Sequence, residues 1–213
     1  MKPTSFRGGR FTMQTTLIVV AGLPGVGKSF IADRIAERID ARILRTDEIR
    51  KEMAGIPQNE KRYEEFGDGI YDKEMGEKTY LEVIRRARDC LSGGRSCIMD
   101  ATFSERKYRD LAFDLAGELE IPFLIVECTC PEEVVIERIN SRVEGGKSIS
   151  DATISIYRKM KDHFEKIEED EVRVVVDTSG NVELMIERLA TYQRTITKVP
   201  DGEGDRDFFG VRA

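Results

Sequence analysis

One short stretch, Gly22–Ser29, constrains the fold of this chain more than any other part of its sequence. It reads Gly-Leu-Pro-Gly-Val-Gly-Lys-Ser and fits the pattern G-x-x-x-x-G-K-[ST], in which backbone amides surround phosphate groups. The apolar run 17–21 before it predicts a buried strand, and apolar residues recur at helical spacing over 30–39 after it. A strand, a glycine-rich loop and a helix in this order predict an α/β fold that binds a nucleoside triphosphate at the loop.

The same loop predicts two cofactors, ATP and Mg²⁺. Its glycines have no Cβ that would keep phosphate oxygens away from the backbone amides. Lys28 is expected to reach the β- and γ-phosphates, and the Ser29 hydroxyl is expected to ligate the Mg²⁺ that bridges them. The residues predicted to contact the nucleotide at this loop are Gly22, Leu23, Pro24, Gly25, Val26, Gly27, Lys28, Ser29 and Phe30.

Composition narrows the possible partners. The formal net charge of −6 mildly disfavours a partner with a long phosphate backbone, such as a nucleic acid. The four cysteines form no C-x-x-C pair, and with a single histidine they make no credible zinc site.

Because no signal sequence and no long apolar run is present, we expect a cytoplasmic protein without membrane contact. The length of 213 residues suits one domain, expected over 15–195 between flexible tails at 1–14 and 196–213.

Apolar strand-like runs alternate with helix-like runs along the chain, which is typical of a parallel sheet covered by helices on both faces. This pattern predicts a three-layer α/β sandwich. Ligands of such open sheets bind beyond the carboxyl ends of the strands, so the residues that follow each strand are the candidates for the site. The five predicted strands are 17–21, 42–46, 97–101, 123–128 and 172–177.

Asp47 and Arg50 follow the second predicted strand, one helical turn apart. A carboxylate at this position could accept the proton of an attacking hydroxyl, and the arginine beside it could orient an anionic acceptor or the transferred phosphoryl group. Aspartate is also a common helix cap, and the spacing alone leaves both roles open for Asp47.

Asp100 ends the third predicted strand, and Phe103 follows it. An acidic residue at this place in phosphate-loop proteins commonly holds Mg²⁺, so Asp100 is predicted as a metal ligand together with Ser29. Asp100 could instead bind the acceptor or cap a helix. Phe103 could belong to the core or form a wall of the acceptor pocket.

Arg138 and Arg142 share one face of the helix predicted after the fourth strand. They precede a glycine-containing stretch, and two guanidinium groups beside such a loop suit a lid, expected at about 143–150, that neutralises charge during transfer. The alternative is a solvated basic face paired with neighbouring glutamates.

Several short segments beyond the loop are shared with a known family. They are 46–50, 69–71 with 79–80, 94–96 leading to 99–103, and 150–152. With the loop, they make the chain resemble the P-loop kinases of the AAA_33 and zeta-toxin-like group, which are related to gluconate kinase, shikimate kinase and the kinase domain of polynucleotide kinases. The segments look like the ATP-binding half of bacterial proteins fused to an aminoglycoside-phosphotransferase-like domain, and we expect the P-loop module to stand alone here.

The resemblance implies a sheet order of 2-3-1-4-5 and a set of roles. Asp47 matches the carboxylate that activates the acceptor hydroxyl, Arg138 and Arg142 match lid arginines near the adenine and phosphates, and Thr178 is placed near the adenine. The catalytic residues are then Lys28, Asp47, Arg138 and Arg142. The substrate-binding residues are Asp47, Arg50, Tyr71, Asp100 and Phe103.

We therefore predict an ATP-dependent phosphotransferase that moves the γ-phosphate of Mg·ATP to a hydroxyl of a small-molecule acceptor. A kinase acting on nucleic acid 5′ ends or on a tRNA-linked amino acid is an alternative that the net charge disfavours. A third class is an acceptor-free ATPase or switch. No N-K-x-D guanine motif is present, and Ala101 stands after Asp100 where ATPases usually carry a glutamate.

Overall fold

The fold is built on a five-stranded sheet in which every neighbouring pair of strands is parallel. A computed structural model describes residues 15–58, 72–142 and 147–195. The strand order is β2-β3-β1-β4-β5, which confirms the predicted order. Each predicted strand is present, and its ends shift by one residue at most. The strands are β1 Leu17–Ala21, β2 Arg42–Arg45, β3 Cys97–Asp100, β4 Phe123–Thr129 and β5 Arg173–Asp177.

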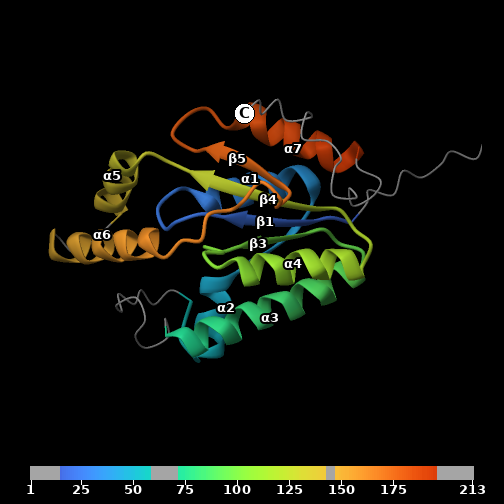
Figure 1. Cartoon of the computed structure of the whole chain (residues 1–213), viewed down its shortest axis with the longest axis horizontal. Helices are drawn as coiled ribbons and strands as arrows, with labels where there is room; N and C mark the ends of the chain where they lie inside the picture. Colours follow the sequence, from blue (N-terminus) through green and yellow to red (C-terminus); the bar gives the residue numbers. More distant parts are fainter. Residues whose placement is uncertain (1–14, 59–71, 143–146, 196–213) are drawn as a thin grey trace, which may run out of the picture.

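Helices cover both faces of this sheet, so the predicted three-layer sandwich is confirmed (Figure 1). Helices α1 and α7 pack on one face, and α3 and α4 pack on the other. Helices α5 and α6 lie beyond the edge where β4 ends. The helices are α1 Lys28–Ile39, α2 Thr46–Met53, α3 Lys73–Ser92, α4 Arg106–Glu118, α5 Glu132–Arg142, α6 Lys147–Asp162 and α7 Glu183–Thr195.

The central strand β1 explains why the core divides in two. Successive side chains of a strand point to opposite faces, and all five residues of β1 are buried. Ile18 and Val20 pack towards α1 and α7, whereas Leu17 and Val19 pack towards α3 and α4. The sheet is therefore fixed from both sides, and its strand ends are held in place for the loops that follow them.

These loops meet at one edge of the sheet because the strands are parallel. β1 runs into the glycine-rich loop, β2 into α2, β3 into a turn at 101–105 and β4 into α5. In Figure 1 this edge faces α5 and α6. Of the described residues predicted to form the site, those at 22–30, 47, 50, 100 and 103 lie on or next to these loops, whereas Arg138 lies further along α5 and Thr178 follows β5.

The lid and the two tails stay predictions. Of the lid expected at about 143–150, residues 147–150 form the first turn of α6, and 143–146 lie outside the described residues. The tails expected at 1–14 and 196–213 also lie outside the described residues. Helix formation over 147–162 agrees with the amphipathic spacing of its later residues, which places Tyr157 in the core beside α5.

Candidate active site

The phosphate loop, residues 22–27, connects β1 to α1 with a backbone that its glycines make possible. Gly27 caps α1 with a φ of +94°, and no side chain caps the helix, so its first N–H groups face the loop. A Cβ on Gly22 would collide with the backbone carbonyl of Cys128 on β4. Close packing against β4 and an open helix N-terminus form a cradle of backbone amides suited to an anion.

Lys28 is the first residue of α1, and its ammonium group is turned back over the loop. Its Nζ donates a hydrogen bond to the carbonyl oxygen of Leu23 at 2.9 Å. Burial lowers the pKa of Lys28, and the negative charge of Asp100 opposes this shift. A half-buried cation that donates to a neutral carbonyl recovers only part of the hydration it has lost, which favours the binding of an anion beside it.

Asp100 ends β3 beside the phosphate loop, and only 6% of the residue is exposed. Its Oδ2 lies 3.5 Å from Nε of Arg45, the last residue of β2. The two residues are direct partners in the register of β2 and β3. Arg45 also forms ion pairs with Asp33 and Glu48. Asp100 is therefore a buried carboxylate in contact with Arg45, and its negative charge also acts on Lys28.

Arg45 was missed at the level of sequence. The signal that could have found it is its position at the carboxyl end of a strand, one place before the segment 46–50. Its contact with Asp100 depends on the pairing of two strands that are more than 50 residues apart in the chain, and no local pattern reveals that pairing.

Asp47 and Arg50 lie together in the first turns of α2. Nη1 of Arg50 is 3.8 Å from Asp47 Oδ1, and Nζ of Lys51 is 3.4 Å from Asp47 Oδ2. Helix α2 begins at Thr46 with Arg45 in the cap position, so the helix-cap alternative for Asp47 is wrong. The Asp47 carboxylate is 56% exposed at the site edge, whereas the Arg50 side chain is largely buried.

Arg138 reaches from α5 to the loop after β5. Its Nη1 donates to Thr178 Oγ1 at 3.1 Å and its Nη2 donates to the Thr178 carbonyl at 2.8 Å. The Thr178 hydroxyl in turn donates to the carbonyl of Val26 in the phosphate loop. Arg138 is half-buried and is part of the site wall, so the solvated-face alternative is wrong for this residue. Arg142 ends α5, and its side chain is not described.

The other predicted residues fall into three groups. Ser29 and Phe30 are exposed on the first turn of α1, with 51% of Phe30 accessible. Phe103 has no exposed surface and packs against Tyr80 in the core, so of its two possible roles the structure supports the core role. Tyr71 lies outside the described residues.

These residues fit Mg·ATP by their chemistry. The loop offers backbone amides and the Lys28 ammonium to phosphates, while the Ser29 hydroxyl and the Asp100 carboxylate are oxygen donors of the kind that Mg²⁺ prefers. Within the described ranges, no three His, Cys, Asp or Glu side chains cluster so that they could hold a metal ion by themselves. In the same ranges, no helix is both long and apolar enough to cross a bilayer.

Fold and loop together define a protein of the P-loop kinase class. The AAA_33 profile, described as an AAA domain, matches residues 17–167. The chain belongs to this family, and the predicted resemblance is confirmed.

Curated relatives share only part of their length with the chain. The uncharacterized protein Rv2004c of Mycobacterium tuberculosis is 32% identical over 142 residues, which cover 66% of this chain and 28% of that protein. The human 6-phosphofructo-2-kinase/fructose-2,6-bisphosphatase 3 is 24% identical over 140 residues, covering 61% of this chain and 26% of that protein. The chain therefore spans about a quarter of the length of these two relatives.

Solved structures share the fold over most of their length. A gluconokinase from Sinorhizobium meliloti 1021 superposes with a TM-score of 0.58 at 20% identity, covering 86% of this chain and 92% of that one. A sugar kinase from Janibacter sp. HTCC2649 gives 0.58 at 24% identity, covering 84% and 94%. The APS kinase CysC of Mycobacterium tuberculosis also gives 0.58, at 15% identity, covering 84% and 96%. At these identities the comparison establishes the fold.

Proposed function

We propose that this protein is an ATP-dependent phosphotransferase that moves the γ-phosphate of Mg·ATP to a hydroxyl of a small-molecule acceptor. The observation that carries the proposal is the phosphate loop at the open N-terminus of α1, over which the Lys28 ammonium is turned. The buried Asp100 carboxylate ends the strand that pairs with β1 beside this loop. This arrangement supplies a cation for phosphate and an oxygen ligand for a metal ion in one place.

On the nucleotide side, the amides of 22–27 and the Lys28 ammonium hold the phosphates. Hydrogen bonds connect Arg138 through Thr178 to Val26 of the loop, and we expect these two residues to contact the base and the phosphates. Arg142 follows four residues after Arg138 in the sequence, and we expect it to supply a second cation. The lysine and both arginines stabilise negative charge that moves from the γ-phosphate to the leaving ADP.

On the metal side, Ser29 and Asp100 hold Mg²⁺. When bound, Mg²⁺ neutralises charge on the β- and γ-phosphates during transfer. Arg45 Nε lies 3.5 Å from the Asp100 carboxylate and places a positive charge beside it. Arg45 thereby becomes a residue of the site, beyond those that the sequence pattern predicts.

On the acceptor side, Asp47 takes the proton of the acceptor hydroxyl. Its carboxylate is exposed at the site edge, so a substrate can reach it, and Arg50 is close enough to orient both. Tyr71 and Asp100 complete the predicted acceptor site, and the buried Phe103 supports it from the core. The names of the structural neighbours support a small-molecule acceptor, since they include a gluconokinase, a sugar kinase and an APS kinase.

The test is ADP release from Mg·ATP across a panel of acceptors, with Lys28→Ala as the blank. The panel holds sugars, sugar acids, nucleosides, aminoglycosides and 5′-hydroxyl oligonucleotides. We expect strong stimulation by one small-molecule class. Stimulation by oligonucleotides alone would favour the nucleic acid kinase, and fast release that no acceptor changes would favour the ATPase or switch. Either result would overturn the proposal.

A further inference from the structure

The turn after β3, residues 101–104, touches the phosphate loop directly. The carbonyl of Thr102 accepts a hydrogen bond from the backbone N–H of Gly22 at 3.1 Å. Gly22 is the first residue of the phosphate loop, and Asp100 lies two residues before Thr102. The conformation of this turn therefore sets the positions of the loop entrance and of the buried carboxylate together.

Phe103 adopts a conformation in this turn that a bulky residue rarely takes. Its φ is +50°, in the left-handed region that favours glycine. Such a conformation persists only where the surroundings determine it more strongly than the local preference does. Two hydrogen bonds hold it: its N–H donates to the Tyr80 hydroxyl at 2.9 Å, and its carbonyl accepts from Arg109 Nη1 at 2.8 Å.

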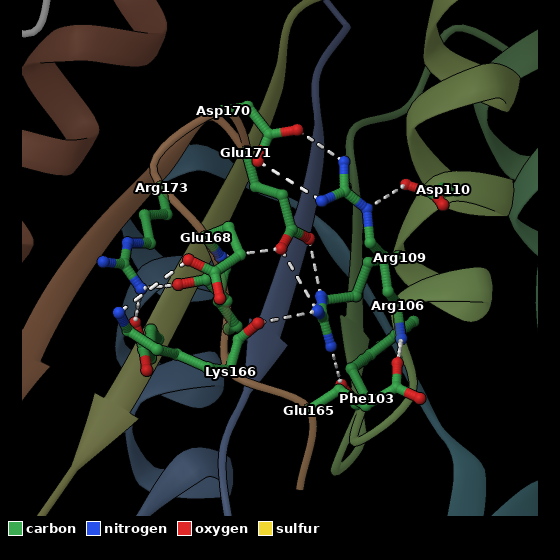
Figure 2. Close-up of polar contacts among 12 residues, drawn as sticks. Phe103, Arg106, Arg109, Asp110, Glu165, Lys166, Glu168, Asp170, Glu171 and Arg173 are labelled. Carbon is green, nitrogen blue, oxygen red and sulfur yellow. Dashed lines mark hydrogen bonds and ion pairs between the residues drawn. The ribbon is translucent and has the colours of Figure 1, made fainter.

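Arg109 is a buried arginine whose guanidinium group donates four hydrogen bonds (Figure 2). It is 1% exposed, and its Nε and Nη2 bind the Glu171 carboxylate at 2.6 and 3.1 Å. Nη2 also donates to the carbonyl of Lys166 at 3.3 Å. The guanidinium group of Arg109 thus joins three segments, namely α4, the turn at Phe103 and the connection between α6 and β5.

A second arginine of α4 joins the same segments at the surface. Arg106 pairs with Asp170 at 2.5 Å and is 44% exposed, and Figure 2 shows it beside Arg109. The Arg106 side chain contacts Asp170 and Asp110, whereas the Phe103 carbonyl accepts from Arg109. Arg106 therefore offers a matched comparison, since it cross-links α4 to the 163–172 connection without holding the turn.

We propose that Arg109 is a positioning residue of the phosphate site, which fixes Phe103 in its left-handed conformation and thereby holds the Thr102 carbonyl against Gly22. Glu171 orients the guanidinium for this task. The inference rests on the proposed function only where it concerns Mg·ATP. Its claim about the turn and the loop entrance is independent of the reaction.

Replacement of Arg109 and Glu171 distinguishes a pair that only stabilises the fold from a pair that positions the turn. Replacement of a buried ion pair by apolar residues of similar volume is often neutral or stabilising. The double variant Arg109→Met/Glu171→Leu is therefore expected to unfold cooperatively near the wild-type temperature. Its turn, however, lacks the donor to the Phe103 carbonyl, because a methionine side chain cannot supply an N–H.

The experiment measures two quantities in the wild type, in the double variant and in Arg106→Ala. The first is the hydrogen-exchange rate of the Gly22 amide without nucleotide. The second is the Kd of Mg·ATP. Loss of a hydrogen bond from a charged donor predicts, in the double variant, about tenfold faster exchange of Gly22 and about tenfold weaker binding. Arg106→Ala is expected to change neither quantity.

A double variant with wild-type Gly22 exchange and wild-type Kd would overturn the proposal and leave the ion pair as a structural cross-link. Failure of the wild type to bind Mg·ATP would refute the proposed function, and Gly22 exchange would then decide the inference by itself. Should the double variant fail to fold, Arg109→Lys keeps a cation for Glu171 but lacks the guanidinium group. The same two changes are expected there, and their absence would count equally against the proposal.

Discussion

Two cations near the candidate site, Lys28 and Arg109, have different surroundings. Lys28, the first residue of α1 after the phosphate loop, donates to the neutral carbonyl of Leu23, and burial lowers its pKa. Arg109, on α4 beside the turn after β3, binds the Glu171 carboxylate through two nitrogens and also donates to two backbone carbonyls. The fold therefore pairs Arg109 with a carboxylate, whereas the hydrogen bond of Lys28 goes to an uncharged group. The first pattern is typical of a structural support and the second of a ligand site.

The largest expected effect tests the ligand side of this comparison. Lys28→Ala should lower phosphoryl transfer by about 10⁴-fold, because cations that meet the transferred phosphoryl group contribute on this scale. The measurement is ADP release with the stimulating acceptor under single-turnover conditions. Full activity in the variant would show that Lys28 does not interact with the transferred phosphate.

On the structural side, Arg109→Ala should lower the free energy of unfolding by about 3–5 kcal/mol, since it leaves the buried Glu171 charge without its partner. Urea unfolding monitored by circular dichroism measures this. Arg106→Ala, on the same helix, should leave the midpoint close to that of the wild type, because its ion pairs are exposed. Equal losses in the two variants would remove the distinction between the buried pair and the surface one.

Asp47→Asn should lower turnover about 10²-fold while the Kd of ATP stays the same, because a general base acts on the acceptor and not on the nucleotide. Steady-state kinetics with varied acceptor, together with a separate binding titration of ATP, tests this split. Unchanged turnover would assign Asp47 to the local ion pairs with Arg50 and Lys51 alone.

Thr178→Val should weaken Mg·ATP binding by about tenfold. The isosteric change removes the hydroxyl that donates to Val26 and accepts from Arg138, so the loop wall loses both bonds. Calorimetric titration measures the affinity. A matched control is Thr191→Val, whose hydroxyl bonds within α7 and is exposed, and which should bind as the wild type does.

The smallest expected effect concerns stability, and its sign is opposite to that of Arg109→Ala. Lys28→Met should raise the free energy of unfolding by on the order of 1 kcal/mol, because it removes a charge that has lost part of its hydration in the folded protein. The folded-state pKa of Lys28 is lowered, so above it the wild type binds fewer protons folded than unfolded, and its stability rises with pH up to the ordinary lysine pKa. The advantage of Lys28→Met should shrink over that interval. A loss of stability at neutral pH would contradict the comparison.

The sequence allowed prediction of the parts of the site that are local in the chain. Lys28 and Ser29 follow from one contiguous motif, and the strands follow from apolar runs whose ends shift by one residue at most. The contacts between distant elements were out of reach. Arg45 meets Asp100 through strand register, and Arg109 meets Glu171 across 62 residues. An arginine within an amphipathic helix gives no sign that it is buried.

Phe103 is another residue whose role could not be decided from the sequence alone. Its identity allowed either a core role or a pocket role, and only the packing against Tyr80 and its positive φ distinguish them. The first residue of α2 was also uncertain, because more than one residue near its start could cap the helix. Asp47 is a favourable cap residue, yet Arg45 takes the cap position because β2 ends there.

The central claim, that the fold holds Lys28 for the phosphates of Mg·ATP, is tested most directly by thermal unfolding with and without that ligand. A ligand at 100 times its Kd adds about 2.7 kcal/mol to the free energy of unfolding, which raises the Tm of a domain of this size by roughly 5–10 °C. We predict this rise for the wild type and its loss in Lys28→Ala. No rise in the wild type, or an equal rise in the variant, would contradict the account.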